Sequence, residues 1–201
     1  MVDAHRQGIL MLLGATLAWS TSGLFARAIT VDTPTMILWR GLAGAAGLLV
    51  VLWWLKGAEG FRDFRRLGAA GWAYAFCSGI AMLLFVGSLR MTSVAHVAII
   101  YATLPFVAAF LGWLTLKEPP GRAGLLAAAL ALAGAAVMVG LGNDGTLIGD
   151  LMAFGMVLAV AAMILIARGN PKAPMLAAGT LSAIWAPLAM VPFSTLAGID
   201  G

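Results

Sequence analysis

The chain has 201 residues, of which 62% are hydrophobic and 10% charged, and its formal net charge is +4. Soluble domains carry charge on roughly a quarter of their residues, so this composition indicates a membrane protein and excludes a disordered chain. The single cysteine, Cys77, cannot form an internal disulfide, which excludes a cystine-stabilised secreted domain. No basic run supports a nucleic-acid partner.

Seven apolar segments are long enough to cross a bilayer, because a spanning helix needs about 20 residues. In chain order they are Gly8 to Ala26, Thr35 to Leu55, Ala69 to Leu89, Val94 to Leu116, Ala123 to Leu141, Leu147 to Ala167 and Pro174 to Leu196. None alternates as a barrel strand would, so we expect an all-α, polytopic bundle of transmembrane helices. The first segment is interpreted as a retained helix, since Ala18-Trp19-Ser20 is a poor signal-peptide cleavage site.

The distribution of basic residues predicts a cytoplasmic N-terminus. In that orientation two basic residues, Arg27 and Arg90, lie outside, and nine lie inside: Arg6, Lys56, Arg62, Arg65, Arg66, Lys117, Arg122, Arg168 and Lys172. The predicted cytoplasmic helix ends also carry the tryptophans Trp53, Trp54, Trp72 and Trp113, as an aromatic belt would. We therefore predict that the Lys56 to Gly68 loop is cytoplasmic and that the Gly142 to Thr146 loop is external.

The sixth segment resembles the first when the two are aligned without gaps. Eight positions carry the same residue in both segments. In the first segment they are Gly8, Leu10, Met11, Gly14, Leu17, Ala18, Ala26 and Arg27, and in the sixth they are Gly149, Leu151, Met152, Gly155, Leu158, Ala159, Ala167 and Arg168. Removing one residue from the following loop also aligns Pro34 with Pro174. Because five spans separate the two segments, the second copy must be inverted, and inverted repeats are typical of secondary transporters.

Several residues together identify a family. They are Trp19, Arg40, the run Tyr101-Ala-Thr-Leu-Pro105, the sequence Leu116-Lys-Glu118, Gly124 and Gly134. With these residues the chain resembles the EamA-type domain of the drug/metabolite transporter superfamily. Members of that family have ten helices in two inverted five-helix repeats, with both termini in the cytoplasm. Two features depart from the family pattern. One is His96, where the family usually has a small or apolar residue, and the other is the pair Pro119-Pro120.

The resemblance implies two domains: residues 1–141 as a first repeat of five transmembrane helices, and residues 147–201 as the start of an inverted second repeat with two. Three helices of the second repeat would then be missing, so we expect a truncated chain. On its own such a chain is expected to be inactive or very weakly active, unless the missing helices or a homo-oligomeric partner complete the bundle.

Arg40 is the one charged residue well inside a predicted span. An arginine at that depth is costly in lipid, so it must snorkel, pair or face the protein interior. Gly44 and Gly47 follow it at helical spacing, which favours a closely packed or cavity-facing side. We therefore interpret Arg40 as a substrate-binding residue that attracts an anionic group, with a structurally paired arginine as the alternative.

The first span carries a polar stripe on one helical face, made of Thr16, Trp19, Ser20, Gly23 and Arg27. Such a stripe is expected to point away from lipid. The hydroxyls of Thr16 and Ser20 could equally bond to carbonyls of their own helix. Trp19 lies near mid-span, away from either interface, so we predict that Trp19 and Ser20 line a substrate cavity.

The fourth span carries three further candidate substrate-binding residues, His96, Tyr101 and Thr103. His96 and Thr103 are seven residues apart and share a face, whereas Tyr101 is about 140° around the helix from His96. The position of His96 within a turn of the outer boundary favours a water-exposed histidine at the rim over a ligand-binding or proton-carrying one. Pro105 predicts a bend at mid-span.

No catalytic, metal-binding or cofactor-binding pattern is present, and no aspartate or glutamate lies well inside a span. We therefore expect a transporter in the inner (plasma) membrane rather than an enzyme. Its partners would be the lipid bilayer and a small metabolite such as an amino acid, moved by alternating access. The resemblance to the family implies export. The alternative is a non-transporting membrane subunit or assembly factor.

Overall fold

The computed structural model describes residues 2–21, 32–117, 121, 123–124, 126–127, 129–130, 133–134, 137 and 145–193. The regular structure in these residues is helical, which confirms the predicted all-α class. The chain divides into two units, residues 1–30 and residues 31–201, which are described separately. In the first unit a helix, α1, spans Val2–Ser20. The remainder of the predicted first span lies outside the described residues.

Four stretches of the second unit are long and apolar enough to cross a membrane. Three of them are single helices, α3 (Thr33–Lys56), α5 (Gly68–Met91) and α9 (Leu147–Gly169), and the fourth is Val94–Thr115. They correspond to the second, third, sixth and fourth predicted segments. The chain is therefore a membrane protein with a helical bundle, although the predicted fifth segment falls mostly outside the described residues.

The start of α3 illustrates how local sequence sets a helix end. The Asp32 carboxylate accepts a hydrogen bond from the Thr35 backbone N–H at 3.0 Å, which satisfies a donor that has no partner within the helix. Pro34 occupies the first turn, where its missing N–H costs nothing. The two residues together fix the beginning of the helix at Thr33.

The fourth predicted segment is interrupted where the sequence predicts a bend. Its first part is α6 (Val94–Ala102) and its second part is α7 (Leu104–Leu116). Between them, the Thr103 N–H donates to the Ile100 carbonyl at 3.1 Å, which is a tighter turn than an α-helical one. Pro105 has no N–H to donate, so the regular helical pattern cannot continue unbroken through this point.

The seventh predicted segment is shorter than expected. Its helix, α10, covers Met175–Leu188 and is followed by the 3₁₀ turn η2 (Val191–Phe193). At 14 residues α10 is below the about 20 residues that cross a bilayer, and Pro187 lies within its last turn. A full span over 174–196 is therefore not found in the described residues, which end at Phe193.

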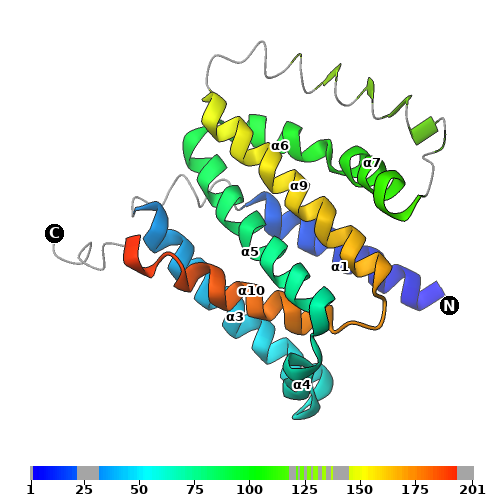
Figure 1. The fold of residues 1–201 in the computed structure, drawn as a ribbon, viewed down its shortest axis with the longest axis vertical. Helices are drawn as coiled ribbons and strands as arrows, with labels where there is room; N and C mark the ends of the chain where they lie inside the picture. Colours follow the sequence, from blue (N-terminus) through cyan, green and yellow to red (C-terminus); the bar gives the residue numbers. More distant parts are fainter. Residues whose placement is uncertain are drawn as a thin grey trace. The chain divides into compact units, whose positions relative to one another are not determined.

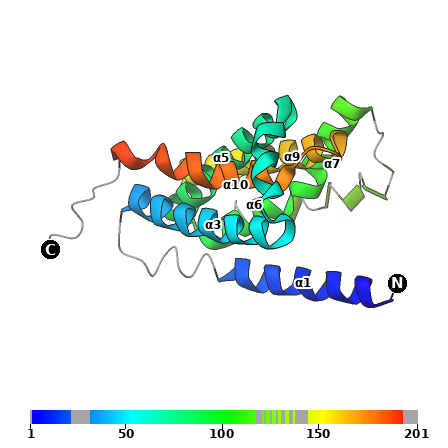
Figure 2. The same cartoon turned by 90° about the horizontal axis from the view of Figure 1, so that it is seen from below.

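Within the second unit, α9 runs beside α5, and α10 packs against both α3 and α5 (Figure 1). The helices α6 and α7 both contact α9, and Figure 2 shows α10 alongside α3 from a second direction. Small residues are buried where these helices meet, including Ala45, Ala153, Ala161 and Ala177. Such residues let membrane helices approach closely.

The unit has two ends, which we name by a residue at each. At the Lys56 end, α3 is joined to α5 through the short α4 (Glu59–Arg62) and η1 (Asp63–Arg66). At the Asp150 end, α5 finishes at Met91, and α6 and α9 begin. Trp53, Trp54, Trp72 and Trp113 are all exposed near helix ends, as the sequence predicts for an aromatic belt.

Candidate functional site

Arg40 lies on an open side of α3. Its guanidinium carbon is 5.4 Å from the centroid of the Phe85 ring on α5, a cation–π distance. Arg40, Gly44 and Gly47 are all exposed, so of the two predicted environments, a closely packed side and a cavity-facing side, the described residues do not provide the close packing. The buried residues in the middle and last part of the helix are Gly41, Ala45 and Leu52. Helical spacing shows that residues share a face, but it cannot show which face meets a neighbouring helix.

The two candidates on α1 differ in what the structure says about them. Ser20 is exposed, and its hydroxyl donates to the Leu17 carbonyl of the same helix at 3.2 Å. This local bond is of the kind that the sequence offers as the alternative to a cavity role. The Trp19 side chain, Gly23 and Arg27 lie outside the described parts. The role of Trp19 and Ser20 in substrate binding stays a prediction.

The three candidates on the fourth span are divided between two sides of the helix. His96 and Thr103 are buried, as is Ile100 between them, which agrees with a shared face. The Thr103 hydroxyl donates to the Ile100 carbonyl at 2.6 Å. Tyr101, on a different side, is half-buried.

His96 is not the water-exposed rim histidine that its sequence position favours, because its side chain is only 6% exposed. Its Nδ1 lies 3.1 Å from Oδ1 and 3.2 Å from Oδ2 of Asp150, in the first turn of α9. The Thr92 hydroxyl, at the end of α5, donates to the same Asp150 Oδ1 at 2.7 Å. We call Thr92, His96 and Asp150 the polar cluster. It joins three helices, and α9 supplies the cover that the sequence position of His96 could not reveal.

Hydroxyl side chains set the starts of both helices that enter the polar cluster. The Ser93 hydroxyl accepts from the His96 backbone N–H at 3.1 Å and so caps α6. The Thr146 hydroxyl accepts from the Gly149 N–H at 3.2 Å and so caps α9. The Thr146 hydroxyl also donates to the Met91 carbonyl, which ties the beginning of α9 to the end of α5.

Gly149 allows α9 to begin directly against the end of α5. A Cβ at this position would lie 2.7 Å from both the Met91 carbonyl carbon and the Thr92 backbone nitrogen. These are backbone atoms and cannot move aside as the tip of a flexible side chain can. The absence of a side chain at Gly149 therefore places Asp150 within reach of both Thr92 and His96.

A second set of polar contacts lies between α5 and α10, away from the helix ends. The Ser78 and Ser182 hydroxyl oxygens are 2.8 Å apart. The Trp185 indole N–H donates to the Ala75 carbonyl at 3.1 Å, and its ring stacks on Phe76 with centroids 5.8 Å apart. Polar groups in a membrane interior need such internal partners because lipid offers none.

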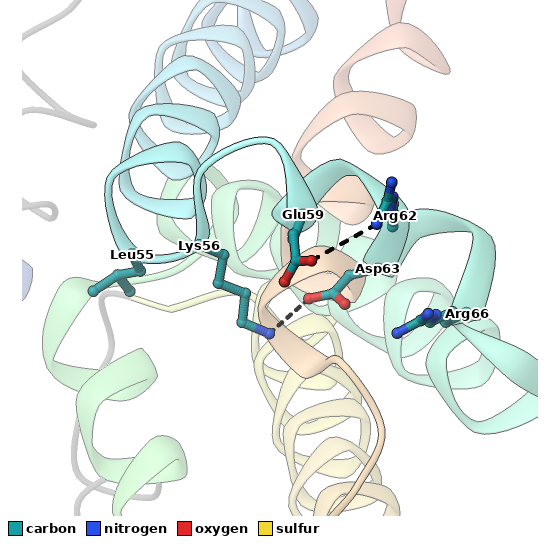
Figure 3. Close-up of a pocket in the computed structure, with 6 residues that line it drawn as sticks. All are labelled: Leu55, Lys56, Glu59, Arg62, Asp63 and Arg66. Carbon is teal, nitrogen blue, oxygen red and sulfur yellow. Dashed lines mark hydrogen bonds and ion pairs between the residues drawn. The ribbon is translucent and has the colours of Figure 1, made fainter.

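A pocket of about 440 Å³ lies at the Lys56 end (Figure 3). Its lining residues are Leu55, Lys56, Glu59, Arg62, Asp63 and Arg66. Lys56 Nζ lies 2.6 Å from an Asp63 carboxylate oxygen, and Arg62 pairs with Glu59 at 3.7 Å. All of these residues come from the end of α3 or from its connection to α5. None is a predicted substrate-binding residue, so we place the candidate substrate site elsewhere.

The residues that the sequence reasoning missed are Thr92, Asp150, Ser78, Ser182 and Trp185. One signal for Asp150 was present in the sequence, because His96 and Asp150 both stand near the starts of spans that begin on the same predicted side of the membrane. For the α5–α10 contacts, a serine in an apolar helix gives no indication of its partner. In the described ranges, no three His, Cys, Asp or Glu side chains are grouped so that they could hold a metal ion.

Comparison with known families gives one match. A family model described as the EamA-like transporter family matches residues 6–140. The match begins in α1 and extends past α7, and it covers well over half of the chain. The segment that contains α9 and α10 follows the matched region. No curated protein and no solved structure matches the chain.

Proposed function

This chain belongs to the EamA-like transporter family, and from that membership we propose that it moves a small organic metabolite across the inner (plasma) membrane by alternating access. Membership makes the chain a membrane transporter of the drug/metabolite type and not an enzyme. The match over residues 6–140 is the observation that carries the proposal. The spans in α3, α5, Val94–Thr115 and α9 support it, since they provide the helical bundle that such a transporter needs.

We infer that the substrate is zwitterionic or weakly anionic, as an amino acid is. Among the described candidate spans, Arg40 is the one charged residue more than about one turn from a helix end. Its guanidinium lies beside the Phe85 ring, so a cation and an aromatic face occur together. A guanidinium binds a carboxylate through paired hydrogen bonds, whereas it repels an organic cation. The Asp150 carboxylate, in the first turn of α9, is already bonded by Thr92 and His96.

Transport assays on membrane vesicles that contain the protein would test this proposal. The panel consists of amino acids, nucleosides and organic cations, each used to compete with a labelled amino acid. We expect amino acids to compete and cations to fail, and a preference for cations would overturn the assigned substrate class. If none of the panel is bound or carried, the chain is better described as a non-transporting membrane subunit.

Substitution of Arg40 separates its role in binding from a structural one. Arg40→Gln is expected to weaken binding of a carboxylate substrate about tenfold or more, since a hydrogen bond to a charged group contributes about 1.5–3 kcal/mol. Arg40→Lys should retain part of the affinity because it keeps the charge. Arg168→Gln, in the last turn of α9, is the control for loss of one positive charge and should leave affinity unchanged.

The proposed orientation places the Lys56 end in the cytoplasm and the Asp150 end outside. The support is the excess of basic residues at the Lys56 end. In a background with Cys77→Ser, a cysteine at Arg65 should react with a membrane-impermeant reagent only after cells are opened. A cysteine at Asn143 should react in intact cells. The reverse pattern would overturn the orientation.

We also propose that residues 1–141 and 147–201 derive from one duplicated, inverted unit. The eight coincident positions of the first and sixth segments support this, and so do two helix starts. Pro34 lies in the first turn of α3, and its counterpart Pro174 directly precedes α10. An inverted pair would place a substrate site between the two repeats. Cross-linking of cysteines at Arg40 and on α1 would test whether the predicted site residues converge.

A further inference from the structure

The polar cluster at the Asp150 end contains one predicted substrate-binding residue, His96, together with Thr92 and Asp150. Three polar side chains from three helices meet there, and all are largely shielded from water. His96 is 6% and Asp150 14% exposed in their side chains. Thr92 is buried as well. Burying a histidine with a carboxylate is costly unless their geometry is good, so the arrangement calls for an explanation.

The hydrogen bonds fix the orientation of the His96 ring. Asp150 accepts from the Thr92 hydroxyl at 2.7 Å and lies 3.1 Å from His96 Nδ1. A carboxylate can only accept hydrogen bonds, so Nδ1 must carry the hydrogen in this contact. Across the described ranges, the hydrogen bonds of the ring are all made by Nδ1. The second ring nitrogen, Nε2, is therefore the atom at which a proton can be gained or lost.

The surroundings favour a negatively charged Asp150. Its carboxylate lies in the first turn of α9, where the partial positive charge of the helix N-terminus stabilises an anion. The Thr92 hydroxyl supplies a second donor. With Asp150 charged, a proton at Nε2 converts a hydrogen bond from a neutral ring into a charge-assisted one, which is shorter and stronger.

Few other charges face this cluster. The elements packed against α6 are α9, α5 and α7. On α9 the charged residues are Asp150 and, at the opposite end, Arg168; α7 has none. On α5 the nearest is Arg90, whose guanidinium lies 3.5 Å from Met36 Sδ on α3. Of the charged groups in the described residues, Asp150 is the one that contacts the ring.

We propose that His96 is a proton-binding site, with Asp150 as its counter-ion, and that the bound proton strengthens the attachment of α9 to α5 and α6 at the Asp150 end. Histidine is suited to this because it changes charge between about pH 5 and 8. Binding is reciprocal: if the proton strengthens this attachment, the attached state must bind the proton more tightly than a separated one. Proton uptake at this end is therefore coupled to whether the three helices are held together.

The proton site stands on geometry alone, whereas its effect on transport rests on the proposed function. A transporter that works by alternating access must open and close each end of its bundle. The polar cluster joins the helix that begins the proposed second repeat to two helices of the first. A proton at His96 would thus favour the closed Asp150 end, and its release would favour opening.

Nuclear magnetic resonance can observe the site directly. The chain has two histidines, His5 and His96, so the variant His5→Gln leaves a single signal set. With ¹⁵N-labelled histidine in the full chain in nanodiscs, we expect Nε2 to gain a proton reversibly between about pH 5 and 8 while Nδ1 keeps its own. A ring that shows no titration across this range would overturn the proposal.

The counter-ion role has a matched pair of variants. In Asp150→Asn, the titration midpoint should change, because the carboxylate that contacts the ring is gone. Asp63→Asn removes a carboxylate of similar exposure at the Lys56 end and should leave the midpoint in place. An unchanged midpoint in Asp150→Asn would contradict the proposal even though the ring titrates.

Thermal unfolding tests the attachment itself. Lowering the pH from about 8 to about 5.5 should stabilise the wild type more than His96→Gln, which keeps His5 but has no titrating group at position 96. If His96→Gln does not fold, Asp150→Asn serves instead, with a reduced pH dependence expected. Equal pH dependence in wild type and variant would show that the proton does not strengthen the attachment.

Vesicle transport at the same pH values separates this proposal from the proposed function. If His96 titrates and stabilises the fold as expected but no substrate is carried, the proton site stands and the transport proposal fails. If transport occurs and its pH profile is the same in wild type and His96→Gln, transport stands, and the coupling of this proton to opening is wrong.

Discussion

Each end of the second unit holds a carboxylate beside a basic side chain, yet the two ends differ in what surrounds the pair. Asp150 and Asp63 are similarly shielded, with side chains 14% and 16% exposed. Their partners are not alike, because His96 is 6% exposed whereas Lys56 is 47% exposed. The comparison shows that the shielding of the partner, more than that of the carboxylate, decides whether a pair is part of the packed structure.

The physical difference lies in what replaces the pair when it breaks. If Lys56 leaves Asp63, water can solvate the ammonium group, so the net contribution of such a pair is small. If Asp150 is lost, the Thr92 hydroxyl and His96 Nδ1–H remain buried and lose their common acceptor. The two ends should therefore differ in how much a substitution lowers the free energy of unfolding.

Asp150→Ala should destabilise the protein by about 2–4 kcal/mol, since each buried donor left without a partner costs about 1–3 kcal/mol. Equilibrium unfolding in mixed detergent micelles, followed by tryptophan fluorescence, would measure it. The matched control is Asp63→Ala at the other end. If both variants lost the same stability, partner shielding would not be the deciding property.

Gly149→Ala should destabilise by about 1–3 kcal/mol, because the added methyl meets backbone atoms of α5 and forces the start of α9 away from it. Gly155→Ala on the same helix is the control. Its Cβ would meet only the Leu84 Cδ1 atom at 3.1 Å, and a side-chain tip can move. In the same unfolding experiment, the free energy of unfolding of Gly149→Ala should be clearly lower than that of Gly155→Ala. The opposite order would count against a close approach of α5 and α9.

Ser182 lies between the two ends of the unit, and Ser182→Ala should have an effect of intermediate size. It removes the 2.8 Å contact to Ser78 but leaves both helices able to pack. Interhelical hydrogen bonds in membranes contribute about 0.6 kcal/mol on average, so a loss near that value is expected. A double-mutant cycle with Ser78→Ala would isolate the pair. A coupling energy of zero would show that each hydroxyl is satisfied by its own helix, as the bond from Ser182 to the Gly179 carbonyl permits.

Lys56→Gln and Glu59→Gln should have the smallest effects, a few tenths of a kcal/mol or less, because both pairs at this end are open to water on at least one side chain. Of the two, Glu59→Gln should have the smaller effect, since Glu59 and Arg62 are the more exposed pair. Added salt should reduce any difference from wild type. A loss above about 2 kcal/mol for either variant would remove the contrast between the two ends.

Several spans were predictable from sequence because their determinants are local. Apolar length predicts α3, α5 and α9 to within two residues at each end, and Pro105 marks the region where the fourth segment is interrupted. The expectation of a full seventh span was wrong for the described residues. The seventh segment was predicted from the length of its apolar stretch, which does not show where a helix ends. The helix α10 ends at Leu188, directly after Pro187.

The candidate site was less predictable, as two residues show. His96 was expected at a water-exposed rim because only its distance from the helix end could be judged from sequence. Arg40 was placed correctly inside a span, but the sequence left open whether its side of the helix is closely packed, and the neighbouring glycines are exposed. In each case the missing information was the position of another helix.

The sequence by itself determined that this protein is an all-helical membrane protein of a transporter family, because hydropathy, charge placement and family residues are properties of the chain alone. The tertiary structure decided that Thr92, His96 and Asp150 meet, that Gly149 permits the contact, and that Arg40 lies beside Phe85. His96 and Asp150 are 54 residues apart in sequence. Helix-to-helix packing brings them within hydrogen-bonding distance, and no local pattern specifies which faces of two apolar helices will touch.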